Sequence, residues 1–372
     1  MFNSLDAPLI LVVAGWVTYV VAMSASRILS RSEILPDKPN HRSSHENVTS
    51  RAGGLAICGG WLVGLIILAV FSGVAEIARY SVLIGGLTFL AMGVGFVDDK
   101  WSVPAFIKFF GQLAVAAIFV MLFGALAFAP VPFFGEIALG AAGAVVTVLW
   151  IVGFMNAFNF MDGANGVAAG AASVGLSAFA IIAAFSGVPF AAAAAILMAL
   201  ACFGFLPANL ARGKLFMGDN GSQSVSFAIA CLGIYAANET GGRVSALVMP
   251  VIFLPFIFDV SWTLLHRAIR KKNIMSAHRE HNYHLLLRFG ASHLKVALIY
   301  MALTAFSSAA AILMLALPPA TQWLAPAFLC AVFALVASGL YRAASKKGFL
   351  DGGSEAAAPK LESLDYELPA AK

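Results

Sequence analysis

A polar segment in the middle of the chain, residues 156–166, carries the densest set of groups that could do chemistry. It contains Asn156, Asn159, Asp162 and Asn165 and lies between two long apolar runs. Such polar groups are costly beside a bilayer core unless they have partners or water. The carboxamides could bind a nucleotide or a sugar, or supply oxygen to a cation, and Asp162 could bind a cation or a hydroxyl. An ordinary loop between membrane spans is the alternative.

Two further segments place carboxylates at the ends of apolar runs. Asp98 and Asp99 are adjacent, which suits a divalent metal ion, or a base whose neighbour is anchored by Lys100. A solvated charge cluster is the alternative, although a negative pair at a helix C-terminus opposes the helix dipole. Asp219 stands in a glycine-flanked turn, residues 218–222. Because Mg²⁺ usually takes one or two carboxylates and keeps its other positions for water and phosphate, Asp219 is a candidate metal ligand.

The first polar segment, residues 36–54, is basic and ends in two glycines before an apolar run. A helix N-terminus behind glycines is a ready anion site. His45 and Arg51 are therefore candidates for contact with a phosphate or a lipid head group. The alternative is a basic loop that only fixes the topology.

The last polar segment, residues 267–293, is the most basic loop of the chain. His278, His281 and His284 are spaced three residues apart, so they would share one face if the segment were helical. Together with Arg279 they could form an anion-binding face for a diphosphate or a nucleotide. A zinc site and a basic amphipathic helix on the membrane surface are the alternatives.

One more aspartate, Asp259, lies within an apolar run. Intramembrane acidic residues are usually functional or paired, and pairing with His266 or Arg267 is here the alternative to a functional role. The four cysteines fall in separate apolar runs without metal-ligand spacing, which predicts buried, reduced thiols.

Membrane-spanning helices must position these segments. Of the 372 residues, 61% are hydrophobic and 11% are charged, whereas a soluble domain has about 25% charged residues. We therefore predict an all-α, polytopic membrane protein built as a helical bundle. Apolar runs of about 20 residues give about eleven spans, at 8–29, 54–72, 80–97, 106–128, 137–156, 167–186, 189–208, 222–238, 245–266, 294–317 and 322–342.

The distribution of basic residues predicts the orientation of the spans. The first basic residues follow the first span, which places the N-terminus outside. Among the 23 lysines and arginines, only Arg79 and Arg243 then fall on the outer side, so the polar segments lie on the cytoplasmic face. The net charge of +5 reflects this bias and not a nucleic-acid surface. Residues 1–345 would form one integral-membrane domain, and residues 346–372 a disordered cytoplasmic tail.

Six short motifs mark the ends of the predicted spans, namely Pro39-Asn40-His41-Arg42-Ser43-Ser44-His45, Arg51-Ala52-Gly53-Gly54, Asp98-Asp99, Asn159-Phe160-Met161-Asp162-Gly163, Phe216-Met217-Gly218-Asp219-Asn220-Gly221-Ser222 and His278-Arg279-Glu280-His281. Together they resemble the polyprenyl-phosphate N-acetylhexosamine-1-phosphate transferase superfamily, of the glycosyltransferase family 4 type. The likeness is closest to the bacterial initiators of O-antigen-type glycans. It implies transfer of a sugar 1-phosphate from a UDP-N-acetylamino sugar to undecaprenyl phosphate among the membrane lipids, with release of UMP. Mg²⁺ would be required, with Mn²⁺ as a possible substitute.

The resemblance implies roles for the carboxylates. Asp219 would hold the metal ion, with Asn159 as a second ligand. Asp98 and Asp99 would position or deprotonate the lipid phosphate and support the metal site, with the division between them open. A metal ion and basic groups would counter the negative charge that develops during phosphoryl transfer.

A nucleotide-sugar site is implied as well, with Asn156 and Asp162 facing the nucleotide or the cation, and His278, Arg279 and His281 gripping the diphosphate and shaping the sugar pocket. Two departures from the family pattern bear on the donor. Asn165 stands where many bacterial relatives have aspartate, and the loop reads His-Arg-Glu-His. UDP-GlcNAc, UDP-QuiNAc and UDP-FucNAc therefore stay open as donors. As for assembly, a homodimer is possible.

A secondary transporter is the competing class, because it would also show about eleven spans and intramembrane aspartates. However, the sequence has no visible two-half symmetry, and its polar residues gather at one membrane face rather than at the midplane. Magnesium-dependent activity in detergent would favour the transferase. Dependence on an ion gradient across sealed vesicles would favour the transporter.

Overall fold

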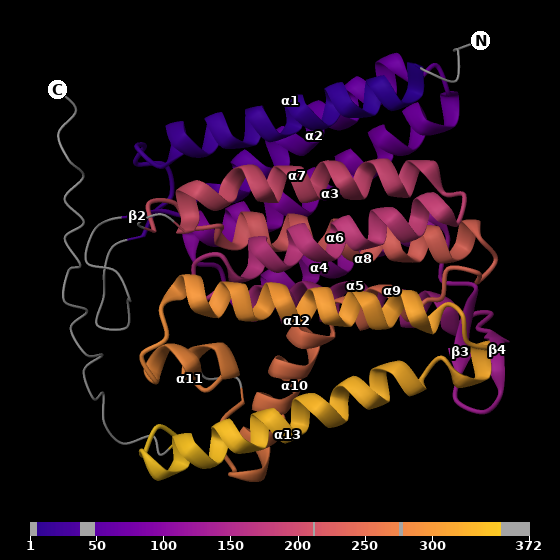
Figure 1. The fold of residues 1–372 in the computed structure, drawn as a ribbon. Coiled ribbons are helices and arrows are strands. Elements are labelled where there is room, and N and C mark those ends of the chain that lie inside the picture. Colours follow the sequence, from indigo (N-terminus) through magenta and orange to yellow (C-terminus); the bar gives the residue numbers. More distant parts are fainter. Residues whose placement is uncertain (1–5, 38–48, 211–212, 275–277, 351–372) are drawn as a thin grey trace, which may run out of the picture.

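The computed structural model describes residues 6–37, 49–210, 213–274 and 278–350 of the chain. Most of its helices run side by side along one axis (Figure 1). Within the described residues, nine helices are long and apolar enough to cross a membrane, which confirms an all-α polytopic membrane protein. The elements are α1 (Asp6–Leu29), β1 (Pro36–Asp37), β2 (Thr49–Ser50), α2 (Gly53–Phe71), α3 (Ala75–Trp101), α4 (Ala105–Phe123), β3 (Phe128–Val131), β4 (Gly135–Ala138), α5 (Ala142–Phe160), α6 (Val167–Phe185), α7 (Pro189–Leu210), α8 (Gly218–Glu239), α9 (Val248–Ile252), α10 (Leu254–Ile269), α11 (Asn282–Arg288), α12 (His293–Met314), η1 (Pro319–Thr321) and α13 (Leu324–Lys346).

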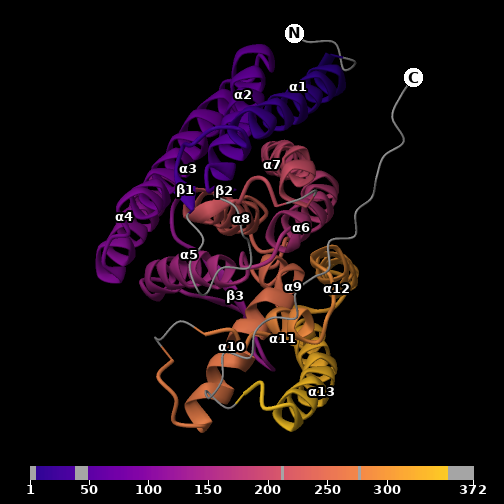
Figure 2. The same ribbon diagram turned by 90° about the vertical axis from the view of Figure 1, so that its left-hand side faces the viewer.

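Helix α8 runs through the centre of the bundle and packs against α2, α3, α5 and α7 (Figure 2). Almost every residue between Asn220 and Ala237 is buried. The hydroxyl of Ser224 donates to the carbonyl oxygen of Asn220, one turn earlier, at 2.8 Å. Because such local bonds satisfy buried hydroxyls, this rather polar helix can occupy the core. The span predicted at 222–238 lies within α8, which is not among the nine apolar helices.

Small residues allow α6 and α7 to pack closely against each other. Ala191, Ala194 and Ala195 of α7 are fully buried. Trp61 of α2 donates a hydrogen bond from Nε1 to the carbonyl oxygen of Ala194 at 2.9 Å. Close contact through small residues is the usual basis of helix packing in membranes.

Two glycines allow α2 and α3 to touch the first turn of α8. A Cβ atom on Gly54 would overlap the backbone nitrogen of Gly221, and a Cβ atom on Gly95 would overlap the carbonyl oxygen of Asp219. Only glycine permits so close an approach of two backbones. The start of α8 is therefore wedged between α2 and α3.

The span predicted at 245–266 is interrupted in the structure. Helix α9 ends at Ile252 and α10 begins at Leu254, with Pro255 in the first turn of α10. A proline lacks the N–H group that would continue a helix, so it is tolerated in a first turn and not in the middle. Helix α10 then leaves the common axis and runs toward α13 (Figure 1). The count of eleven spans stays a prediction.

A hairpin of β3 and β4 follows α4 at the end of the bundle away from β1 and β2 (Figure 1). It occupies parts of the spans predicted at 106–128 and 137–156, so α4 ends earlier and α5 begins later than predicted. The hairpin is largely apolar apart from Glu136 in β4, and Phe133 and Phe134 are exposed at its tip. Hydropathy alone therefore does not distinguish it from a membrane span.

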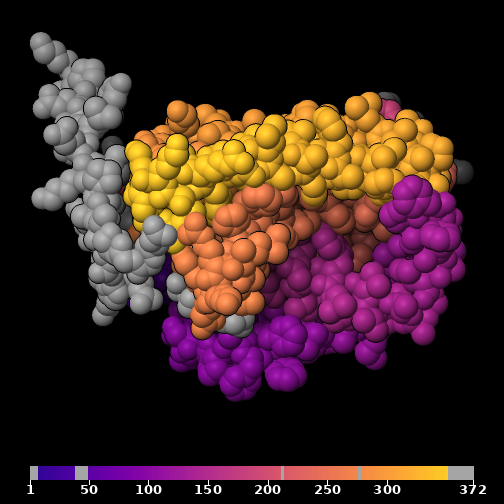
Figure 3. Space-filling view, turned by 90° about the horizontal axis from the view of Figure 1, so that it is seen from below, coloured from indigo at the N-terminus to yellow at the C-terminus, as the bar shows by residue number. Residues whose placement is uncertain are grey.

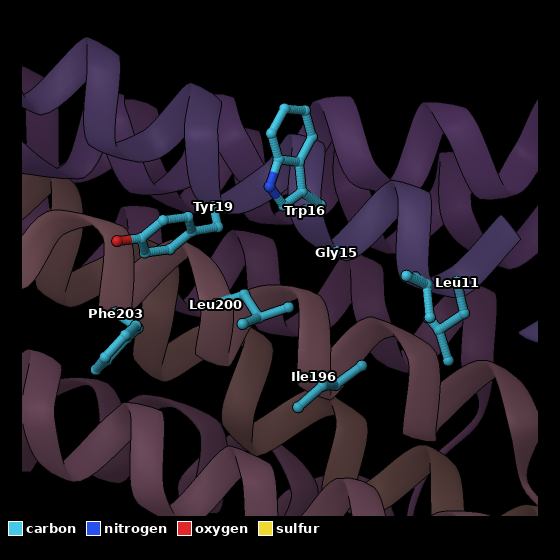
Figure 4. Close-up of a pocket in the computed structure, with 8 residues that line it drawn as sticks. Leu11, Gly15, Trp16, Tyr19, Ile196, Leu200 and Phe203 are labelled. Atoms are coloured by element: carbon cyan, nitrogen blue, oxygen red, sulfur yellow. The ribbon is translucent and has the colours of Figure 1, made fainter. Parts of the chain in front are cut away.

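The surface is hollowed in regions of different character. An open groove of about 540 Å³ between α1 and α7 is lined by apolar and aromatic residues such as Trp16 and Tyr19, and none of the described residues that line it is charged (Figure 4). On another face, the molecule is hollowed between α10 and the α4–α5 region (Figure 3). The α1–α7 groove is thus mainly apolar, whereas the candidate site residues lie at the helix ends.

Candidate active site

Three helix ends bring the predicted carboxylates together at the end of the bundle that carries β1, β2 and α11 (Figure 1). Asp98 and Asp99 lie in the last turn of α3, and Asn159 lies in the last turn of α5. Asp219 lies in the first turn of α8. The side chains of Asp98 and Asp219 are 21% and 26% exposed. They are thus largely sheltered, yet within reach of a ligand.

Asp99 fixes the start of α8. Its carboxylate accepts hydrogen bonds from the backbone N–H groups of Asp219 and Asn220, at 3.1 and 2.8 Å, and from the side-chain amide of Asn220 at 2.6 Å. The first N–H groups of a helix lack partners within it, and the helix dipole favours a negative charge there. The same Asn220 amide donates to the carbonyl oxygen of Arg51 at 2.7 Å. Sequence reasoning missed this role of Asn220.

Lys108 of α4 joins Asp98 to Asp219. Its Nζ atom lies 3.1 Å from Oδ2 of Asp98 and also forms an ion pair with Oδ2 of Asp219. Lys100, which the sequence suggested as the anchor of the aspartate pair, instead lies over the ring of Trp101, 4.6 Å from its centroid. Sequence reasoning missed Lys108, although a single lysine inside a predicted span is itself a signal of function or pairing.

The two asparagines at the end of α5 have different surroundings. The side-chain amide of Asn159 donates to Oδ1 of Asp219 and to Oγ of Ser222, both at 2.8 Å. Asn156, one turn earlier, donates from Nδ2 to Oε1 of Gln112 at 2.9 Å. Asn159 therefore lies among the carboxylates, whereas Asn156 belongs to an amide network deeper in the bundle.

Asp162, in the loop after α5, adds a fourth carboxylate. Burial raises the pKa of its carboxyl well above the usual range, and the negative charges of Asp219 and Asp99 raise it further. We call Asp98, Asp99, Asp162 and Asp219 the carboxylate cluster. Within the described residues, Lys108 is the one lysine or arginine that forms ion pairs with it. Part of the rise in the pKa of Asp162 comes from repulsion by Asp219 and Asp99, and a bound cation would relieve that repulsion.

The donor groups of the cluster suit Mg²⁺. Asp219 offers carboxylate oxygens, and Asn159 would offer its carbonyl oxygen after a half-turn of its amide, which exchanges oxygen and nitrogen. Mg²⁺ is commonly held by one or two protein oxygens and otherwise by water and substrate phosphates. No three His, Cys, Asp or Glu side chains in the described ranges are arranged to hold a metal ion.

The histidine segment does not form the predicted helical face. Residues 278–281 are not helical, and α11 begins only after them. The rings still lie together, with the centroids of His278 and His281 4.9 Å apart and those of His281 and His284 6.3 Å apart. Burial, followed by nearby positive charges, lowers the pKa of His278 to about 4 and that of His284 to about 3. The exposed Arg279 thus lies next to the imidazole of His278, which is neutral at pH 7.

The histidine loop, residues 278–284, lies against the central polar segment. Tyr283 donates a hydrogen bond from its hydroxyl to the carbonyl oxygen of Phe160 at 2.9 Å. The Phe160 ring stacks on His281 with 6.1 Å between centroids. A Cβ atom on Gly163 would overlap the Tyr283 hydroxyl, so glycine permits this close approach. The loop and the carboxylate cluster therefore border one site.

The interpretation that Asp259 pairs with His266 or Arg267 is wrong. Its carboxylate lies 2.5 Å from the hydroxyl of Tyr300 and 3.4 Å from Nδ1 of His281. Arg267 instead forms an ion pair with Glu280 at 2.7 Å. These partners lie on α12 and in the histidine loop, which hydropathy does not place next to α10.

The first polar segment is only partly described, because His45 lies outside the described residues. Arg51 forms an ion pair with Asp37 at 2.8 Å, and its side chain is 41% exposed. The backbone N–H groups of Gly53 and Gly54 donate to carbonyl oxygens of the loop before α8 at 2.9 Å. The prediction of an anion site at these amides is therefore wrong, since the contact of α2 with that loop already uses them.

Two comparisons with known proteins bear on this arrangement. Residues 81–237 match the family model described as Glycosyl transferase family 4. A probable undecaprenyl-phosphate N-acetylglucosaminyl 1-phosphate transferase of Bacillus subtilis is 32% identical over 320 residues, covering 84% of this chain and 87% of the relative. The chain belongs to glycosyl transferase family 4. This membership confirms the resemblance to the polyprenyl-phosphate N-acetylhexosamine-1-phosphate transferases.

Other relatives of this glycosyl transferase family 4 protein have similar names. A decaprenyl-phosphate N-acetylglucosaminephosphotransferase of Mycobacterium tuberculosis is 34% identical over 311 residues, covering 74% of this chain and 75% of the relative. An undecaprenyl-phosphate alpha-N-acetylglucosaminyl 1-phosphate transferase of Escherichia coli K12 is 28% identical over 278 residues, covering 71% and 72%. The family model extends from α3 into α8 and so contains the whole carboxylate cluster.

Proposed function

We propose that this glycosyl transferase family 4 protein transfers an N-acetylamino-sugar 1-phosphate from a UDP-sugar to undecaprenyl phosphate. UMP leaves, and the polyprenyl-diphosphate sugar starts a lipid-linked surface glycan such as an O-antigen. The observation that carries this proposal is the carboxylate cluster with Lys108, at one end of an apolar bundle and beside a loop with an exposed arginine. A membrane lipid phosphate and a water-soluble nucleotide can meet there. The relatives' names describe the same kind of transfer.

In the proposed reaction, an oxygen of the lipid phosphate attacks the β-phosphorus of the UDP-sugar. A bond forms between these atoms while the bond from the β-phosphorus to the bridging oxygen breaks, and UMP leaves with the electron pair. Catalysis of such transfers is mostly positioning and neutralisation of charge. Mg²⁺ bound at Asp219 and Asn159 would supply neutralising charge at the diphosphate.

The contacts of the aspartates support a division of labour on the lipid side. Asp98 and Lys108 face each other at the partly exposed edge of the cluster, where they would receive and orient the lipid phosphate. Lys108 would give that phosphate a positive partner. Asp99 is committed to the first turn of α8, so it would act by holding Asp219 in place.

The histidine loop would bind the donor. Arg279 is exposed and would pair with the diphosphate, while His278 and His281 would shape the sugar pocket. Asp162 would face the nucleotide or the cation from the neighbouring loop. Asn156 is bonded to Gln112, so it would support the nucleotide side from within the amide network.

UDP-GlcNAc is the first donor to test, because the relatives are named for N-acetylglucosamine. UDP-QuiNAc and UDP-FucNAc follow, since the histidine loop departs from the common family forms. The orientation indicated by the basic residues would place the site on the cytoplasmic face of the bacterial inner membrane, where a cytoplasmic nucleotide sugar can reach it.

The proposal is tested with purified protein in detergent, undecaprenyl phosphate, Mg²⁺ and a panel of UDP-N-acetylamino sugars. We expect UMP release from one donor together with a polyprenyl-diphosphate sugar of matching mass. EDTA should abolish both products, and added Mg²⁺ should restore them. A folded protein that releases no UMP from any donor would contradict the proposal, and transport driven by an ion gradient in sealed vesicles would then be measured.

A further inference from the structure

A buried aspartate of α10, Asp259, is surrounded by polar groups from the histidine loop and its neighbours. Its side chain is only 1% exposed. Three of the five groups that face it belong to the histidine loop. The five are the backbone N–H of Asn282 at 2.8 Å, the backbone N–H of Tyr283 at 3.4 Å, Nδ1 of His281 at 3.4 Å, the hydroxyl of Tyr300 at 2.5 Å and the hydroxyl of Thr263 at 3.2 Å.

A carboxylate suits this position for two physical reasons. Asn282 and Tyr283 begin α11, and the first N–H groups of a helix have no partners within it. A negative charge near these groups is favourable, whereas a buried charge without donors would be costly. Asp259 and the start of α11 therefore stabilise each other only while the histidine loop keeps the conformation seen in the structure.

Glu280 ties the same loop to α10 at a second point. Its carboxylate pairs with Arg267 at 2.7 Å and with Lys272 at 3.0 Å. Its carbonyl oxygen accepts a hydrogen bond from the hydroxyl of Tyr341 at 2.7 Å. Glu280 is the residue at which this loop departs from the family pattern. Its carboxylate anchors the loop, so it is not available to bind a ligand.

Tyr283 connects Asp259 to the active site. Its backbone N–H is held by Asp259, and its hydroxyl donates to the carbonyl oxygen of Phe160. Phe160 is the last residue of α5 and precedes Asp162 by two positions. A shift at Asp259 would therefore reach both the histidine loop and the stretch that carries Asp162.

We propose that Asp259 is a positioning residue for binding of the sugar nucleotide. It sets the place of His281 and, through Tyr283, that of the stretch beside Asp162. This inference rests on the proposed function, because it takes the histidine loop as the part that binds the donor. Binding of the lipid phosphate is assigned to other groups, so it should not depend on Asp259.

The test compares Asp259→Asn, Tyr300→Phe and Tyr19→Phe in the full-length protein. Asp259→Asn keeps the shape but removes the charge, and Tyr300→Phe removes one donor should the first variant fold poorly. Tyr19→Phe removes a hydroxyl from α1, on the far side of the bundle from α10 (Figure 2), and is the matched control. We expect the KM for the UDP-sugar to rise about tenfold in Asp259→Asn and about threefold in Tyr300→Phe, with the KM for undecaprenyl phosphate within about twofold of wild type.

Hydrogen exchange provides a readout that does not depend on turnover. The backbone amides at the start of α11 should exchange faster in Asp259→Asn than in the wild type and the control. An unchanged donor KM with unchanged exchange would overturn the inference, and so would an equal rise of both KM values, which would indicate general damage. If the wild type releases no UMP from any donor, the proposed function fails first and the inference with it.

Discussion

Asp98 and Asp99 are adjacent in the sequence, yet their carboxylates are committed to different groups. Asp98 faces Lys108 at 3.1 Å, while Asp99 accepts hydrogen bonds from the first turn of α8. Successive residues on a helix point about 100° apart, so one carboxylate can face a ligand while its neighbour holds the protein together.

Asp98→Asn and Asp99→Asn should therefore differ in what they damage. We expect Asp98→Asn to lower UMP turnover by about 10²-fold or more without lowering the melting temperature. Asp99→Asn should lower both, because loss of the charged acceptor at α8 costs about 1.5–3 kcal/mol per hydrogen bond. Turnover and thermal unfolding are measured on the same samples. Equal destabilisation of the two variants would contradict the division of roles.

Lys108 and Lys100 offer a matched pair of lysines, eight positions apart in the chain. Lys108→Gln should lower turnover by about 10²-fold, because it removes the positive charge between Asp98 and Asp219. Lys100→Gln should stay within about twofold of wild type, since that side chain is exposed and rests on Trp101. Steady-state UMP release is measured for both variants and compared with the wild type. Near-normal turnover in Lys108→Gln would remove this lysine from the mechanism.

At the scale of elements, the sequence predicts at which helix ends the candidate site residues lie, but not which of their side chains are in contact. Polar residues end apolar runs, so Asp98, Asn159 and Asp219 were expected at helix ends on one side of the membrane. Lys108 and Asp219, however, are 111 positions apart, and Asp259 and Tyr300 are 41 positions apart. Such contacts depend on how helices rotate and pack, which one-dimensional hydropathy does not specify.

The hairpin of β3 and β4 and the break between α9 and α10 escape prediction from the sequence for the same reason. The hairpin overlaps the ends of two predicted spans and the break falls inside a third, because the length and hydropathy rule follows composition and not the path of the backbone. Strand pairing and the interruption beside Pro255 are local backbone events. The histidine loop differs for another reason, because its start is shaped by Asp259 and Glu280 rather than by the three-residue spacing of its histidines.

Gly95 and Gly86 of α3 provide a test of the contact between α3 and α8. Gly95→Ala would push a Cβ atom into the carbonyl oxygen of Asp219, whereas a Cβ atom on Gly86 would meet nothing within 4 Å. Overpacking of this kind costs about 1–3 kcal/mol, so Gly95→Ala should lower both the melting temperature and UMP turnover. Gly86→Ala should keep both, since alanine favours a helix. Equal behaviour of the two variants would show that α8 is not held by this contact.

At the scale of the whole molecule, the two ends of the helical bundle differ in chemical character. One end carries the carboxylate cluster, the histidine loop and the end of α13, and the other carries the apolar hairpin of β3 and β4 (Figure 1). Between them, large apolar side chains in the middle of long helices, such as Leu149 of α5 and Leu335 of α13, are exposed. A lipid surrounding makes this surface favourable, and the protein can then present its cluster to only one compartment.

Cysteine labelling of the two ends tests which compartment that is. Phe134, at the tip of the hairpin, is 82% exposed, and Lys346, at the end of α13, is exposed as well. Phe134→Cys and Lys346→Cys would each be placed in a Cys330→Ser background, because the other three native cysteines are buried. We expect a membrane-impermeant maleimide to label Phe134→Cys in right-side-out vesicles and Lys346→Cys only in inverted ones, as the distribution of basic residues predicts. The reverse pattern would turn the carboxylate cluster away from cytoplasmic nucleotide sugars and would contradict the proposed orientation.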